Sequence, residues 1–163
     1  VGLLQLLRDG DSAGKAQAAN ALSNVTRNNE DNQIMILRAG AADCLVQLLE
    51  SGDTEGRTPV LGLFNILASN ANNHIAFSRL RVVKPLVDLL RTGVAAGKTQ
   101  AAGALRNLAS VAKYQTAIDL AGAIEPLMEL SHMGDVDQKS EAAGALKKLA
   151  SNVHIRMPVK AWT

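Results

Sequence analysis

Apolar residues recur at helical spacing along most of the chain, in stretches that are rich in leucine and alanine. In the longest stretches the apolar positions lie three and four residues apart, as in an amphipathic helix with one buried face. These positions are Ala18, Ala21, Leu22 and Val25, then Ala101, Ala104, Leu105 and Leu108, then Ala142, Ala145, Leu146 and Leu149. The pattern predicts long helices over residues 13–27, 55–69, 97–112 and 137–151.

Two shorter helices are predicted before each complete long one. The first set covers residues 31–39, 74–80 and 114–121, and the second covers residues 43–50, 84–91 and 124–131. Gly40 and Gly122 suit the ends of the first set, because glycine adopts the left-handed cap conformation easily. Pro85 and Pro126 fall in the first turn of the second set, where a missing N–H has little effect.

The chain matches itself when it is shifted by one repeat length, which is about 40 residues. One column of this repeat holds asparagine in the long helices, and its members are Asn24, Asn65 and Asn107, with Lys148 in the last copy. A second column holds Leu6, Leu48, Leu89 and Leu130. One such unit cannot bury its apolar face alone, whereas stacked units share a continuous core. The repeat therefore predicts an all-α solenoid of about four repeats.

The repeat period also sets the expected organisation of the chain. The array covers residues 1–152, with a partial repeat 1–28 that lacks its first helix and further repeats 29–70, 71–111 and 112–152. The first and last repeats are expected to be incomplete. Residues 153–163 read as a tail or as the start of a further repeat.

Composition narrows the class of protein. Aromatic residues make up 2% of the chain, and its apolar mass is leucine and alanine, which favour helices over a β-sandwich. The net charge of +2 comes from 17 basic and 15 acidic residues, which does not indicate nucleic-acid binding. No apolar run is long enough for membrane insertion. The single cysteine fits a reducing compartment, so we expect an intracellular protein, cytoplasmic or nuclear.

Residues that could carry chemistry fit the repeat better than an active site. Cys44 occupies the column of Pro85 and Pro126, so a structural role is expected. The histidines, which are His74, His132 and His154, occupy different columns and lack metal-ligand spacing. The Gly97-Lys98-Thr99 sequence lacks the earlier glycine of a phosphate-binding loop. We therefore expect no catalysis, no metal and no cofactor in this segment.

Two stretches carry a specific resemblance. The sequence IMILRAGAADCLVQLLESGD begins at Ile34 and AAGALRNLAS begins at Ala101. Both resemble the consensus of the armadillo repeat family. The pattern AAGALRNLA is most similar to armadillo proteins of plants, fungi and protists. The resemblance implies a right-handed superhelix that acts as a protein-interaction scaffold. It also implies that the third, longest helices line a concave groove in which the asparagine column binds the main chain of an extended partner.

The resemblance thus implies a set of partner-binding residues on the third helices. They are Asn20, Asn24, Arg27, Asn65, Gln100, Gly103, Arg106, Asn107 and Lys148. An asparagine amide offers donors and an acceptor, so it can pair with a peptide group of any sequence. The alternative is that these asparagines bond within their own repeat and that the flanking residues form a solvated face. Glycine at 103 and 144 implies close approach of a neighbouring backbone or of a ligand.

The expected partner is a protein or peptide. The nuclear-import adaptors of this family place Trp four residues before the groove asparagine, whereas this chain has Asn20, Leu61, Gly103 and Gly144 there. Binding of a classical nuclear-localisation signal is therefore not expected. Basic residues near the third helices favour an acidic segment instead. The alternatives are a structural or homo-oligomeric role, or a substrate-recruiting module of a larger enzyme such as a ubiquitin ligase.

Overall fold

The structure is a computed structural model that describes residues 2–51, 54–77 and 81–158. Throughout that part of the chain, every regular element is a helix, with eleven α-helices and one short 3₁₀-helix. The chain divides into two compact units, residues 1–85 and residues 86–163, and each is described by itself. The all-α class predicted from the apolar pattern is confirmed.

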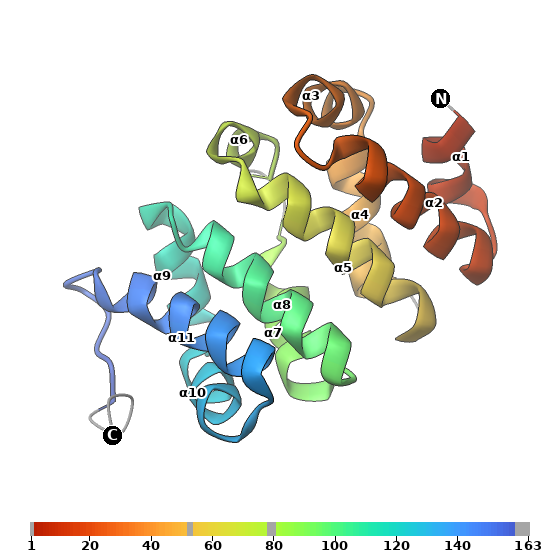
Figure 1. Ribbon diagram of the computed structural model, residues 1–163. Coiled ribbons are helices and arrows are strands. Elements are labelled where there is room, and N and C mark those ends of the chain that lie inside the picture. The colour runs from red at the N-terminus through yellow and green to blue at the C-terminus, as the bar shows by residue number, and fades with distance from the viewer. Residues whose placement is uncertain (1, 52–53, 78–80, 159–163) are drawn as a thin grey trace. The chain divides into compact units, whose positions relative to one another are not determined.

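Unit 1 holds two long helices that lie side by side with shorter helices around them (Figure 1). Its elements are α1 (Gly2–Asp9), α2 (Ser12–Thr26), α3 (Glu30–Arg38), α4 (Ala41–Ser51), α5 (Thr54–Ser69), the 3₁₀-helix η1 (Ala71–Asn73) and α6 (His74–Phe77). The long pair is α2 and α5; α1 packs on α2, and α4 packs on α5. The first short helix, α3, contacts α2 and α4.

Unit 2 has the same kind of arrangement. Its elements are α7 (Val83–Thr92), which belongs to this unit from Leu86 onward, α8 (Ala95–Leu108), α9 (Ala112–Leu120), α10 (Ile124–Met133) and α11 (Val136–Ala150). The long helices α8 and α11 lie side by side, α10 packs on α11, and α9 contacts both long helices (Figure 1).

Most predicted helix boundaries agree with the structure to within two residues. The end of the third long helix is an exception, because α8 stops at Leu108 and not at residue 112. Val111 adopts an extended conformation (φ −118°, ψ 125°) as the N-cap of α9, and this ends the helical run. The predicted helix 74–80 is described only as α6, since residues 78–80 lie outside the described part of the chain.

Glycine and proline act at the helix ends as the sequence predicts. Gly40 and Gly122 follow α3 and α9 with φ of +87° and +71°, the left-handed region that side chains with a Cβ rarely adopt. Pro85 and Pro126 lie in the first turns of α7 and α10. These residues therefore fix where the first short helix ends and the second begins.

Acidic caps fix the starts of two long helices. The Asp11 carboxylate accepts a hydrogen bond of 2.8 Å from the Gly14 N–H at the start of α2. Asp135 and Gln138 form a capping box at the start of α11, with bonds of 2.8 and 3.0 Å. Each cap satisfies N–H groups that have no partner inside the helix.

Leucine and alanine fill the core, as predicted, and two phenylalanines are its largest members. The rings of Phe64 and Phe77 are fully buried, with centroids 4.7 Å apart. One predicted core position is wrong, because Val25 is 48% exposed. Thr26 is fully buried in its place, since its hydroxyl donates to the Leu22 carbonyl at 2.7 Å and so needs no water.

Candidate binding surface

In unit 2 the predicted surface residues lie on the two long helices that run side by side. They are Gln100, Gly103, Arg106 and Asn107 on α8 and Lys148 on α11. Gly103 is buried, and the other four are half-buried. The residues best defined by their contacts are Arg106 and Lys148.

The Arg106 side chain crosses from α8 to α11. Its Nε lies 3.1 Å from Glu141 Oε2, and a Cβ built on Gly144 would lie only 2.6 Å from Arg106 Cδ. The absence of a side chain at Gly144 therefore leaves room for the arginine stem. We expected a backbone or a ligand to approach this glycine. This expectation is wrong, because a side chain of the neighbouring helix, Arg106, fills the space.

Lys148 joins the same two helices one turn further along. Its ammonium group donates to the Ser110 hydroxyl at 2.5 Å. Burial lowers the pKa of the Lys148 ammonium from its ordinary value, and the nearby positive charge of Arg106 lowers it further. With Glu141 as the counter-ion of Arg106, this part of the surface holds two cations and one carboxylate.

In unit 1 the predicted residues of α2, together with its C-cap Arg27, form a stripe. Asn20, Asn24 and Arg27 are four and three residues apart and are all exposed, so they share one face of the helix. Asn65 on α5 is half-buried, whereas Leu61, one turn before it, is fully buried. The exposed polar face of this unit is therefore carried mainly by α2.

This stripe ends at a pocket of about 540 Å³ near the C-terminal ends of α2 and α5. Arg27 and Glu30 supply its charges, and Asn70 lies on the α5 side. Asn28, also in the lining, has a φ of +58°, which asparagine tolerates better than most residues. Arg27 thus belongs both to the predicted stripe and to a hollow in the surface.

Comparison with known proteins explains why the two units look alike. The family model described as "Armadillo/beta-catenin-like repeat" matches residues 76–110. An engineered protein of known structure is 31% identical over 98% of this chain and 64% of its own, with a TM-score of 0.85. A designed armadillo repeat protein solved in complex with the peptide (KR)4 is 25% identical over 92% of this chain, with a TM-score of 0.82. The chain has the fold of an armadillo repeat protein.

Other comparisons add the fold and its extent. A structure of computationally designed armadillo repeat proteins for modular peptide recognition is 22% identical over 93% of this chain, with a TM-score of 0.84, and so shows the fold alone. This armadillo chain spans 64% of the length of each of these three structures. No curated protein matches the sequence.

A polar column of the armadillo repeat was missed in the sequence. Gln33, His74 and Gln115 recur at one constant spacing and are buried, on α3, α6 and α9. Each side chain bonds a carbonyl near the end of the preceding long helix, through Gln33 Nε2 to Thr26 O (2.9 Å), His74 Nε2 to Ala68 O (2.7 Å) and Gln115 Nε2 to Ala109 O (2.8 Å). The constant spacing was the available signal, and it went unused because the residue type changes.

The other residues that could carry catalytic or metal-binding chemistry are either buried in the core or do not cluster. Cys44 is buried in the first turn of α4, and burial raises the pKa of its thiol, which disfavours the reactive thiolate. Among the described residues, no three His, Cys, Asp or Glu side chains come together as a metal site would require. In that same part of the chain, no helix is both long and apolar enough to cross a bilayer.

We expect Arg106→Met to raise the pKa of Lys148 part of the way to its usual value. The variant removes the neighbouring charge but leaves the burial, which is the larger cause. The pKa of Lys148 is lower in the folded chain than in the unfolded chain. At a pH between these two pKa values the unfolded chain binds more protons, so the contribution of Lys148 to the free energy of unfolding rises as the pH rises. Side-chain NMR titration of Lys148 tests this, with Arg91→Met as the control; an unchanged pKa in Arg106→Met would refute the charge effect.

Proposed function

We propose that the chain binds an extended segment of a partner protein along the long helices, over α2 and α5 in unit 1 and over α8 and α11 in unit 2. The observation that carries this is the asparagine column. Asn24 is exposed and Asn65 and Asn107 are half-buried at equivalent repeat positions. Peptide binding by a designed armadillo protein that is 25% identical supports the same use of the fold here.

Main-chain recognition follows from the chemistry of the amide. An asparagine side chain can donate to a peptide carbonyl and accept from a peptide N–H, so one residue can hold one peptide group of any sequence. Repetition of this amide in three successive repeats, with Lys148 at the same position in the fourth, suits a partner that is itself extended and periodic. Affinity is then distributed over several repeats, in the proposed divisions 1–28 (a partial repeat), 29–70, 71–111 and 112–152.

The charges of α8 and α11 favour an acidic partner. Arg106 and Lys148 lie together, and Glu141 offsets only one of these two positive charges. A partner carboxylate beside Lys148 would favour the charged ammonium that burial and Arg106 disfavour. The designed protein of known structure holds a basic peptide, (KR)4, whereas the two cations of this chain are proposed to select an acidic one.

A peptide selected from a displayed random library tests this function. We expect the triple variant Asn24→Ala, Asn65→Ala, Asn107→Ala to bind that peptide about ten-fold more weakly, since each exposed bond contributes roughly 0.5 kcal/mol. The measurement is titration calorimetry, with circular dichroism to check that the helices remain.

The matched control removes three polar side chains elsewhere, namely Gln47, Thr116 and Ser140, all of which are exposed. Alanine at these positions should leave the affinity unchanged. Full affinity in the asparagine variant, or an equal loss in the control, would place the binding surface elsewhere on the chain.

A further inference from the structure

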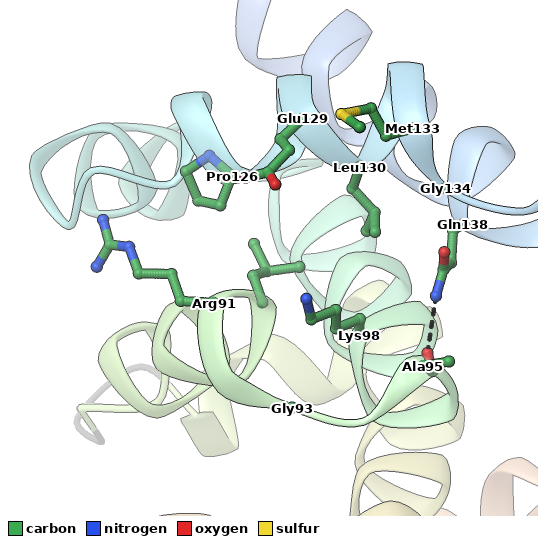
Figure 2. Close-up of a pocket in the computed structure, with 11 residues that line it drawn as sticks. Arg91, Gly93, Ala95, Lys98, Pro126, Glu129, Leu130, Met133, Gly134 and Gln138 are labelled. Atoms are coloured by element: carbon green, nitrogen blue, oxygen red, sulfur yellow. Dashed lines mark hydrogen bonds between the residues drawn. The ribbon is translucent and has the colours of Figure 1, made fainter.

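Unit 2 contains a second hollow that the asparagine column does not touch. It is a pocket of about 410 Å³ bounded by the end of α7, the start of α8, one side of α10 and the start of α11 (Figure 2). Lys98 lies in the pocket on α8, whereas Asn107 lies nine residues further along the same helix. At 3.6 residues per turn these two residues are on opposite sides of α8. The pocket is therefore independent of the proposed peptide surface.

Apolar side chains line two sides of the pocket, whereas most of its exposed lining is polar. On α10, Pro126, Leu130 and Met133 follow the spacing of one helical stripe. Leu90 lies on the α7 side and is 3% exposed, whereas Met133 at the mouth is 82% exposed. A methionine this exposed beside buried leucines offers a flexible apolar surface to an incoming side chain.

Two charged groups point into the same space from opposite sides. Lys98 projects from α8 and Glu129 projects from α10 (Figure 2). Across residues 2–51, 54–77 and 81–158, the Lys98 ammonium takes part in no ion pair. The pocket thus combines apolar side chains with a cation that has no counter-ion among the described residues.

The other polar groups of the lining are already engaged. The Gln138 amide donates to Ala95 O at 3.1 Å, which ties α11 to α8 at the edge of the pocket (Figure 2). Arg91 Nη2 donates to Gly122 O at 2.9 Å, which holds its guanidinium toward the loop before α10. These bonds fix the rim and leave Lys98 as the group best placed to select a ligand.

We propose that this pocket docks a segment of a partner protein that carries a large apolar side chain next to an acidic one. The apolar side chain packs against the exposed Met133 beside Leu130, and the carboxylate pairs with Lys98. Glu129 repels a carboxylate on the opposite side and accepts main-chain N–H groups, so it sets the direction of the segment. The two cations and one carboxylate of the lining, which are Arg91, Lys98 and Glu129, match an acidic segment in net charge.

The repeat itself provides a control for Lys98. Basic residues occupy the same position near the start of each long helix, at Lys15, Arg57, Lys98 and Lys139. Lys139 is exposed on α11 and is not among the residues that line the pocket. Lys98→Met and Lys139→Met therefore remove the same charge from equivalent repeat positions, but only the first changes the pocket.

The test titrates the chain with blocked alanine-based hexapeptides that contain Leu-Glu or Glu-Leu, followed by amide NMR shifts. We expect saturable shifts around Gly93 and Gly134 for at least one order. Replacing the peptide's leucine by alanine should weaken binding at least about ten-fold, and replacing its glutamate by glutamine about two- to five-fold. Lys98→Met should remove the preference for glutamate over glutamine, and Lys139→Met should keep it.

Other outcomes overturn the proposal. They are the absence of saturable shifts with both peptides, shifts centred on Asn107 and Lys148, and equal glutamate preference in Lys98→Met and the unaltered chain. The asparagine triple variant separates the two proposals, because it should bind these hexapeptides as the unaltered chain does.

Discussion

Phe64→Ala is expected to destabilise unit 1 by about 3–5 kcal/mol, the usual range for removing a buried phenylalanine ring. The ring is fully buried on α5 and packs at 4.7 Å against the ring of Phe77, which is also fully buried. The cost includes both lost burial and the void that remains.

Hydrogen exchange followed by mass spectrometry is the appropriate measurement, because it reports the two units separately. Protection in α2 and α5 should fall sharply in Phe64→Ala. Ile75→Ala is the control, since this side chain is 82% exposed and its removal should change protection little. Equal effects of the two substitutions would show that the Phe64–Phe77 contact does not stabilise unit 1.

Local sequence signals predicted the helices well because each signal acts within a few residues. Gly40 and Gly122 end helices through their own backbone conformation, and Pro85 and Pro126 fit first turns through their own missing N–H. None of these effects depends on a distant partner. The constant repeat period then predicted an all-α solenoid, because similar units must share a core, and the resemblance of two stretches to the family consensus implied the armadillo type.

The candidate site was harder to predict from the sequence, because its contacts join residues of different helices. The sequence identified Arg106 as a basic residue of the third helix, next to Asn107, but it could not show that the arginine stem lies over Gly144. Nor could it show that Lys148 reaches Ser110, 38 residues earlier. Whether a polar residue faces solvent or a neighbouring helix depends on packing, and periodicity within one helix does not specify that.

The polar column of Gln33, His74 and Gln115 shows a different limit. The spacing of Gln33, His74 and Gln115 was visible, but their acceptors are backbone carbonyls, which any sequence supplies. Glutamine and imidazole share little except an N–H donor at a similar reach. A comparison by residue type therefore overlooks the column, whereas a comparison by donor at equal spacing would find it.

The same column supports a second prediction with a large expected effect. Gln115→Leu should lower the free energy of unfolding of unit 2 by about 2 kcal/mol, which is the usual cost of a buried polar group left without its partner. The Gln115 amide donates to Ala109 O at 2.8 Å and to Lys148 O at 3.2 Å, and so links the ends of α8 and α11. Leucine has a similar size but no donor. Lys148 O keeps the Ser151 hydroxyl as a donor at 2.6 Å, so the main loss is the buried bond to Ala109.

Gln115→His should recover much of that stability, because His74 already makes the equivalent bond to Ala68 O at 2.7 Å. Urea unfolding of the three proteins tests the order glutamine, histidine, leucine. Since Asn107 and Lys148 lie in the last turns of the helices that Gln115 links, peptide affinity should follow the same order. A leucine variant as stable as the unaltered chain would mean that these bonds do not hold the two helix ends together, and that the proposed binding surface is positioned by the leucine and alanine core alone.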